Sequence, residues 1–221
     1  MRNFKLLYAL VIVLVSISVS ACGEDEITNP ENAQWSVVIA KVNDSADAPY
    51  SVSVNWIGDS SQYDQPYKVE LLIGDEPVQL NNWNTYWIGE ALLTPGDYYT
   101  VELSIDEMQM CKTSLFIVND ATASFPGDYN PSSTAYLSWS LNGSNQTQRI
   151  SVVSFNNADN TMDDFEEIIP PSSRSFYLPA NIVQSYGAQT TYTLEVTQIN
   201  TKSVNDVLLI SSQSQFKDYG F

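Results

Sequence analysis

The chain has 221 residues, with 26 acidic side chains, nine basic side chains and a net charge of −17, and it contains no histidine. A surface this acidic repels nucleic acid and anionic lipid head groups, and the sequence has no basic stripe that could contact phosphates, so nucleic-acid binding is excluded. The lack of histidine also removes Ser-His-Asp and Cys-His catalysis and any His-ligated zinc site.

The first residues of the chain predict its destination. Arg2 and Lys5 form a short basic start, and residues 6–20 are an apolar run broken only by serines. This arrangement is typical of a secretory signal peptide, and the run is shorter than the ~20 residues that a membrane-spanning helix needs. We expect residues 1–21 to be removed, which would take the net charge of the mature chain to −19.

The apolar run ends in Val19-Ser20-Ala21-Cys22. These residues resemble the lipobox of bacterial lipoproteins, in which an aliphatic residue, a small residue and Ala or Gly precede the cysteine. The resemblance implies that Cys22 becomes the acylated first residue, carrying chains such as palmitate, and that residues 22–33 tether the protein to its membrane. Several acyl chains anchor stably where one does not, because each buried CH₂ contributes only ~0.8 kcal/mol. The alternative is an ordinary signal peptide in which Cys22 is coincidental.

An acidic run, Glu24-Asp25-Glu26, follows the lipobox-like residues. It resembles the export signal of surface lipoproteins of Bacteroidota, which implies a location in the outer membrane of the cell envelope with the chain exposed at the surface. The same residues also suit a solvated tether. The sequence does not decide between the two interpretations.

Only two cysteines occur in the chain. If Cys22 is acylated, Cys111 has no partner for an intrachain disulfide. Cys111 alternates with Thr113, Leu115 and Ile117 along one face of a predicted strand. This pattern favours a buried, unreactive thiol over a reactive one.

The first half of the mature chain reads as short strands separated by turn residues. Residues 50–56 and 98–105 alternate apolar and polar side chains, which is typical of an antiparallel sheet with one buried face. We predict strands over residues 34–41, 50–57, 67–73, 78–80, 85–92, 98–105 and 109–118.

Residues 119–133 interrupt this pattern with Pro126-Gly127-Asp128 and Asn130-Pro131, which are typical of turns and linkers. A second string of strands is predicted over residues 134–141, 148–155, 173–178, 190–200 and 204–212. Two strings of this length predict two β-sandwiches in tandem, over residues 34–122 and 123–221. We expect each sandwich to unfold independently, because domains joined by such linkers share modest interfaces.

Several runs resemble fibronectin type III and related immunoglobulin-like domains. Residues 52–56, of the form Val-x-Val-x-Trp, match the second strand, and residues 93–103 match the corner and sixth strand, with Tyr99 as the corner tyrosine. Leu137-Ser138-Trp139-Ser140 matches the tryptophan strand of a second domain, whereas the loop over residues 180–191 departs from the pattern. The resemblance implies an all-β chain of two tandem immunoglobulin-like sandwiches with Trp56 and Trp139 in their cores. It implies no function, because this fold hosts many roles.

Trp83, Tyr86 and Trp87 form the densest aromatic cluster in the sequence. Exposed rings could stack on sugars or peptides, whereas buried rings would belong to the core. On a single strand Trp83 and Trp87 would share one face and Tyr86 would lie on the other. The sequence leaves both roles open for all three residues.

Residues 156–171 are predicted to form an acidic loop that contains Asp163-Asp164-Phe165-Glu166-Glu167. Calcium takes six to eight oxygen ligands, but the spacing does not fit an EF-hand, so a solvated loop is the simpler interpretation. A carboxylate pair for glycoside hydrolysis would need two groups facing each other across a cleft rather than crowding in one loop. We expect no metal and no cofactor.

Taken together, these observations predict a non-catalytic lipoprotein of the cell envelope that acts as an interaction or structural module for an unknown protein or glycan partner. The alternative is a glycan-binding surface lipoprotein working beside a polysaccharide importer, with Trp83, Tyr86 and Trp87 as its contacts. Enzymatic activity is not expected without histidine and without converging carboxylates.

Overall fold

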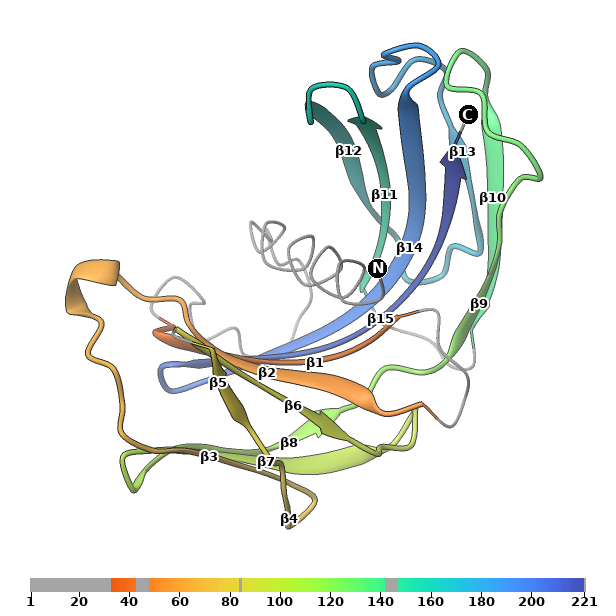
Figure 1. The fold of residues 1–221 in the computed structure, drawn as a ribbon. Coiled ribbons are helices and arrows are strands. Elements are labelled where there is room, and N and C mark those ends of the chain that lie inside the picture. The colour runs from red at the N-terminus through yellow and green to blue at the C-terminus, as the bar shows by residue number, and fades with distance from the viewer. Residues whose placement is uncertain (1–32, 43–47, 84, 142–146, 221) are drawn as a thin grey trace.

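The computed structural model describes residues 33–42, 48–83, 85–141 and 147–220, whose regular secondary structure is almost entirely β-strand (Figure 1). Cys22 and the predicted signal peptide lie outside these residues. The strands form three sheets of eight, three and four strands. The predicted all-β fold with sandwich-like sheets is therefore confirmed.

The first eight strands form what we call the N-terminal lobe. They are β1 (Trp35–Val42), β2 (Tyr50–Trp56), β3 (Val69–Ile73), β4 (Glu76–Pro77), β5 (Asn81–Trp83), β6 (Tyr86–Ala91), β7 (Tyr98–Ile105) and β8 (Met108–Phe116). Strands β1, β2, β6 and β5 are neighbours in one sheet, and β4, β3, β7 and β8 form the sheet that faces it. This division of the strands between two sheets is that of an immunoglobulin-type sandwich.

The remaining strands form the C-terminal lobe. They are β9 (Ala121–Ser124), β10 (Ala135–Leu141), β11 (Thr147–Asn156), β12 (Met162–Ile169), β13 (Ser175–Leu178), β14 (Thr190–Val204) and β15 (Val207–Gly220). One sheet has the order β13-β10-β9, and β12, β11, β14 and β15 are neighbours in the other. Apart from the short β5, the strand order is therefore the same in both lobes. The sheet β9-β10-β13 corresponds to β1-β2-β6, and β12-β11-β14-β15 corresponds to β4-β3-β7-β8.

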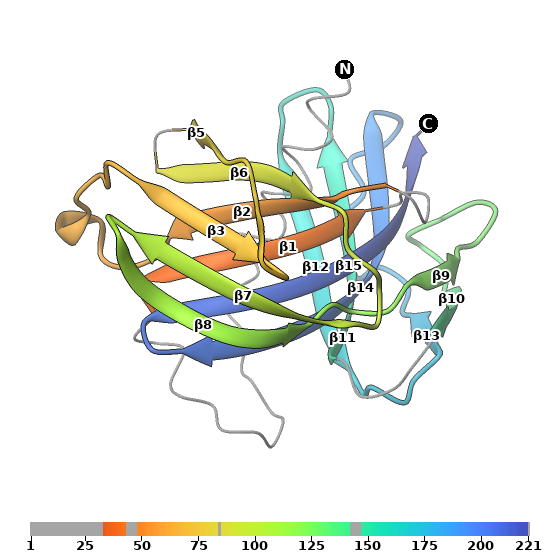
Figure 2. The same ribbon diagram turned by 90° about the horizontal axis from the view of Figure 1, so that it is seen from below.

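A long hairpin joins the two lobes. Strands β14 and β15 have 15 and 14 residues, and the first half of β15 pairs in parallel with β1, from Trp35 opposite Val207 to Val42 opposite Ser214. Figure 2 shows β15 and β1 side by side. As a result one eight-stranded sheet runs through both lobes. The predicted division after residue 122 does not separate the two cores, because Val207 and Leu209 of β15 pack in the core of the N-terminal lobe.

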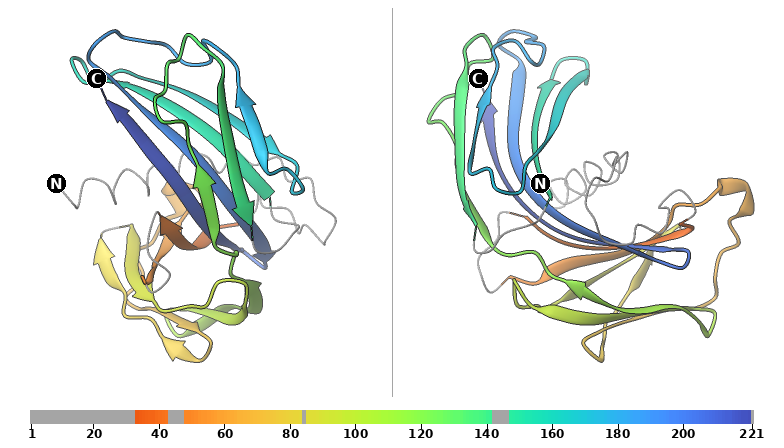
Figure 3. Two further views of the ribbon diagram at one scale, coloured as in Figure 1. Left: turned by 90° about the vertical axis from the view of Figure 1, so that its right-hand side faces the viewer. Right: turned by 180° about the vertical axis from the view of Figure 1, so that it is seen from behind.

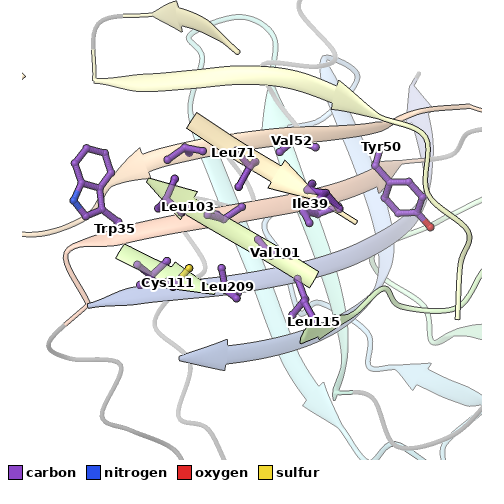
Figure 4. Packing of buried hydrophobic residues seen from close by; sticks show 14 of the residues in the cluster. Trp35, Ile39, Tyr50, Val52, Leu71, Val101, Leu103, Cys111, Leu115 and Leu209 are labelled. Atoms are coloured by element: carbon purple, nitrogen blue, oxygen red, sulfur yellow. The ribbon is translucent and has the colours of Figure 1, made fainter. Parts of the chain in front are cut away.

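Each lobe has its own apolar core. In the N-terminal lobe, β1 and β2 contribute Ile39 and Val52, and these pack with Leu103 and Leu115 from the facing sheet (Figure 4). The C-terminal core combines Leu137 and Trp139 of β10 with Ile150, Val152 and Leu194 of the large sheet. These side chains come from alternate positions of their strands, as a one-sided sheet requires.

Between the two cores lies a row of buried polar side chains. Gln148, Gln198, Gln213 and Lys41 stand directly opposite one another on β11, β14, β15 and β1, and each is at most 3 % exposed. Their long polar side chains separate the apolar side chains of the two lobes, so the cores do not merge although the sheet is continuous.

The segment that follows β8, residues 117–121, is hydrogen-bonded to β15 beside this polar row. The backbone N–H of Val118 donates to Ser211 Oγ at 3.0 Å, and that of Ala121 donates to Gln213 Oε1 at 2.6 Å. Gln213 Nε2 in turn donates to Asp120 Oδ1 at 3.0 Å. The predicted linker over residues 119–133 is therefore bonded to the shared sheet from its start, and it contains strand β9.

The corner before β7 has the predicted geometry. Tyr99 Oη accepts a hydrogen bond from the backbone N–H of Thr94 at 2.9 Å, as the corner tyrosine of this architecture does. The turn requires Gly96, whose φ is +84° and whose Cβ, if present, would lie 2.5 Å from Asn119 Oδ1. Tyr99 is thus confirmed as the corner tyrosine.

Several predicted elements and boundaries are wrong, two of them near the candidate sites. Residues 78–80 lie outside the strands, whereas residues 162–169, predicted as part of a loop, form β12 at the edge of the large sheet. In β12, Phe165 packs against the core, Ile169 is buried, and Asp164 and Glu166 alternate with them. Charged side chains are common on edge strands, where they oppose pairing with other chains.

Candidate ligand-binding surface on strands β5 and β6

The three clustered aromatic residues divide between the two faces of the β5–β6 hairpin. Trp83 of β5 stands directly opposite Tyr86 of β6, so these two side chains share a face. Trp83 is 60 % exposed and Tyr86 is half-buried, whereas Trp87 is only 5 % exposed. The expectation that Trp83 and Trp87 share a face is wrong, because they belong to two paired strands rather than to one.

Trp87 belongs to the core of the N-terminal lobe. Its ring lies 5.9 Å from that of Trp35, which in turn meets Trp56 edge to face at 5.2 Å. Trp87 is therefore unavailable to a ligand. The predicted core residue Trp56 is half-buried at the margin of this cluster, and its indole N–H donates to the Asp59 carbonyl at 3.3 Å.

The predicted core role of Trp139 is confirmed in the C-terminal lobe. Trp139 is 5 % exposed, and its indole N–H donates to Gln148 Oε1 at 2.5 Å. Gln148 Nε2 donates to the carbonyls of Pro170 and Pro171. Both polar ends of this buried pair are satisfied.

Trp83 and Tyr86 share their face with polar groups that could bind a ligand. Asn81 stands opposite Ile88 on that face, and Glu90 follows two residues later. An open depression of about 300 Å³ is lined by Gln79, Asn81, Ile88, Gly89 and Glu90. Trp83 and Tyr86 do not line it; they lie two residues from Asn81 and Ile88 on the same face of the hairpin. An exposed indole beside two amides and a carboxylate combines a stacking surface with hydrogen-bonding groups, as ligand sites do.

Gly89 explains why the chain can form this depression. A Cβ at Gly89 would lie 2.5 Å from the Gln79 carbonyl oxygen, so only glycine allows this close approach of backbone to strand β6. The sequence pattern did not indicate Gln79, Asn81 and Glu90 as site residues, because it predicts a strand over residues 78–80 and no strand at β5. The Gly89 interruption of an otherwise strand-like run was the available signal.

Three acidic side chains in and near β12 form hydrogen bonds or an ion pair within the protein. Asp159 Oδ1 accepts hydrogen bonds from the hydroxyl and the backbone N–H of Thr161, and these bonds lower the pKa of Asp159. Asp163 Oδ2 accepts from the backbone N–H of Gln184 at 2.6 Å, and Glu166 lies 3.4 Å from the guanidinium of Arg149. Within the described residues, no three Asp, Glu or Cys side chains form a group that could hold a metal ion.

Cys111 is buried in the N-terminal core at 1 % exposure, as predicted, and burial raises the pKa of its thiol. A thiol of this kind is mostly protonated and shielded near neutral pH. None of the described segments contains a helix long and apolar enough to cross a membrane.

Comparison with known proteins assigns this chain to no family. No family model matches the chain, and no curated protein matches it. Among solved structures, the chain is similar to fibronectin(III)-like modules of Clostridium thermocellum CbhA, with 9 % identity over 82 % of this chain and 93 % of that chain and a TM-score of 0.25. It is also similar to the FN1–FN3 domains of chicken CNTN1, with 12 % identity over 85 % and 68 % of the two chains and a TM-score of 0.24. Scores this low carry no argument about family or function.

Proposed function

We propose that this protein is a non-catalytic lipoprotein of the cell envelope, with fibronectin type III-like lobes, that acts as a rigid interaction or structural module. The observation that carries the proposal is the eight-stranded sheet shared by both lobes. A continuous sheet resists bending between the lobes, unlike a flexible linker, so it can hold a binding surface at a fixed orientation. The lack of histidine, which excludes Ser-His-Asp and Cys-His chemistry, supports a role without catalysis.

Anchoring through Cys22 would keep the lobes close to the membrane. Eleven residues, 22–32, would separate the acylated end from the described part of the chain, and fully extended they reach roughly 36 Å. The strongly negative chain would be repelled by anionic lipid head groups. The lipid would therefore hold the protein, while its own surface charge keeps the lobes off the bilayer.

Replacing Cys22 tests the anchor. We expect Cys22→Ser to release the full-length protein from the membrane fraction, and mass spectrometry of the wild-type N-terminus to show an acylated Cys22. Cys111→Ser is the matched control, because that thiol is buried in the core, and it should leave membrane partitioning unchanged. Quantitative membrane retention of the Cys22→Ser protein would contradict the proposal.

A glycan-binding role is the second candidate, supported by Trp83 and Tyr86 beside the depression on β5 and β6. Uncharged polysaccharides suit an indole surface flanked by amides. Binding should be measured by affinity electrophoresis in gels containing neutral polysaccharides such as starch, xylan or mannan. We expect Trp83→Ala to weaken binding about tenfold or more, as the loss of an aromatic anchor does.

The control for that experiment is Tyr98→Ala. Tyr98 is 73 % exposed but lies on β7, in the facing sheet, where its ring packs against Phe116. Its replacement should leave glycan binding intact. If no polysaccharide retards the wild-type protein, or if both variants bind equally well, the glycan role is wrong.

A further inference from the structure

The outer face of the three-stranded sheet has an unusual composition. The inward positions of β10 and β13 carry core side chains such as Leu137, Trp139 and Leu178. The outward positions of the sheet all carry tyrosine, serine or threonine: Thr122, Ser124, Tyr136, Ser138, Ser140, Ser175 and Tyr177. Among the described residues no strand packs on this face, which is turned toward the viewer in the left panel of Figure 3.

This tyrosine–serine face carries no charge, unlike other outward sheet faces of the protein. The β7–β8 face carries the Glu102–Lys112 ion pair at 2.7 Å, and the β11–β12 face carries Arg149 and Glu166. Charged residues are depleted in the centres of protein interfaces, because they are costly to remove from water. The tyrosine–serine face can therefore be desolvated without burying an ion.

Two exposed tyrosines form one end of the face. Tyr136 and Tyr177 stand opposite each other on β10 and β13, are 48 % and 67 % exposed, and have ring centroids 4.8 Å apart. Their planes are inclined at 48°, so the pair does not offer the single flat platform on which a sugar ring stacks. Tyrosine is instead among the side chains that contribute most to protein–protein binding.

We propose that a second copy of this chain docks on the tyrosine–serine face, with the two copies related by a twofold axis. Chains with a net charge of −17 repel one another, and an uncharged face is where two copies can approach at the smallest electrostatic cost. Tyrosine rings and hydroxyl groups, which both donate and accept hydrogen bonds, are also self-complementary, as a twofold contact requires.

The face is small, since β9 and β13 have only four residues each, so we expect a weak dimer. High salt should strengthen it, because salt screens the repulsion between the two acidic chains. This dependence distinguishes it from an ionic contact, which salt weakens. If the chain is anchored as proposed above, confinement to a membrane would raise its effective concentration.

Sedimentation velocity over a range of protein concentrations and at two salt concentrations tests the proposal. The wild-type protein without its signal peptide should show a monomer–dimer equilibrium, and Tyr136→Ser combined with Tyr177→Ser should weaken dimerisation about tenfold or more. Ser140→Glu is a second variant that places an acidic group on the face without removing a ring. Tyr67→Ser, at a 74 % exposed tyrosine elsewhere, is the control and should dimerise normally.

Three outcomes overturn the proposal. The wild-type protein could remain monomeric at all concentrations, or it could dimerise with both face variants unaffected, which would place the contact elsewhere. A monomeric chain that captures a different protein through Tyr136 and Tyr177 would assign the face to that partner instead. None of these outcomes depends on how much of the Cys22→Ser protein stays in the membrane fraction. The dimerisation proposal and the anchoring proposal can therefore be contradicted independently.

Discussion

At the scale of single residues, Trp56 and Trp139 have different environments, although the resemblance to fibronectin type III domains implies the same core role for both. Trp139 is enclosed in the C-terminal core and donates to the buried Gln148, whereas Trp56 is half-buried at the edge of its core. The stability contribution of a large aromatic residue depends on how much of its surface leaves water and on the partners it satisfies.

We therefore predict unequal losses of stability for the two alanine variants. Trp139→Ala should lower the free energy of unfolding by about 3–5 kcal/mol, because it opens a cavity and leaves Gln148 Oε1 without its donor. Trp56→Ala should lower it by roughly 1–2 kcal/mol, because part of that ring already contacts water. Urea unfolding followed by circular dichroism measures both values, and equal losses would contradict this assignment.

Gln148 and Gln198, two members of the buried polar row between the cores, differ in their hydrogen bonding. Both amide atoms of Gln198 are buried and find no hydrogen-bond partner among the described residues, whereas Gln148 makes three hydrogen bonds. Replacing an unsatisfied buried polar group with an apolar one of similar shape is nearly neutral or stabilising, whereas breaking satisfied bonds is costly.

Gln198→Met should accordingly leave the free energy of unfolding unchanged or raise it, and Gln148→Met should lower it by about 1–3 kcal/mol. Chemical denaturation of the two variants under one condition provides the comparison. A larger loss for Gln198→Met would show that the Gln198 amide has a partner, such as a buried water molecule.

At the scale of elements, β15 serves two cores. Its first half contributes Val207 and Leu209 to the N-terminal core, and Tyr219 near its end packs in the C-terminal core. A strand distant in sequence thus completes the sheet beside β1, where an unpaired edge would otherwise be exposed.

Leu209→Ala should therefore open the N-terminal core, although it lies near the C-terminus of the chain. Leu209 is fully buried, and a substitution of this kind costs about 2–5 kcal/mol. Cys111 in the same core reports the opening, because its thiol is only 1 % exposed in the folded protein. We expect faster labelling of Cys111 by a thiol reagent in Leu209→Ala than in the wild type.

Ser212→Ala is the control for that measurement, since Ser212 lies on the opposite face of β15 and its substitution removes only a hydroxyl group. Labelling of Cys111 in this variant should match the wild-type rate. If Leu209→Ala also leaves the rate unchanged, β15 does not contribute to the stability of the N-terminal core.

At the scale of the whole molecule, the shared sheet changes the expected unfolding behaviour. Separate sandwiches joined by a linker would unfold in two steps, each affected only by its own substitutions. Here the hairpin of β14 and β15 passes through both lobes, and Lys41 of β1 lies 4.0 Å from Asp120 in the segment between them. Loss of either core removes strands on which the other depends.

We predict a single cooperative transition, and Trp139→Ala offers a direct test. That substitution removes the only tryptophan after residue 87, so the remaining tryptophan fluorescence comes from the N-terminal lobe alone. The fluorescence midpoint should fall together with the midpoint from circular dichroism. A fluorescence midpoint that stays at its wild-type value would show that the lobes unfold independently.

The sequence by itself determined the local features of this protein. Alternation over residues 98–105 predicted β7 with its observed bounds, and the resemblance of residues 93–103 to a fibronectin type III corner implied the role of Tyr99, because both depend on residues close together in the chain. The buried position of Cys111 followed from the same period of two. Strand β12 was predicted as a loop because it is rich in acidic residues. Charged side chains are common at an edge of a sheet, where β12 lies, and the alternation of residues does not show that a strand lies at an edge.

Only the tertiary structure decided which strands pair and which faces they present. The parallel pairing of β15 with β1 joins residues about 170 positions apart, and no local pattern specifies such a partner. The hairpin of β5 and β6 likewise placed Trp83 outside and Trp87 inside, because one turn between them reverses the chain and resets the alternation. Local sequence fixes the period of a strand, whereas its neighbours and its buried face depend on contacts between distant segments.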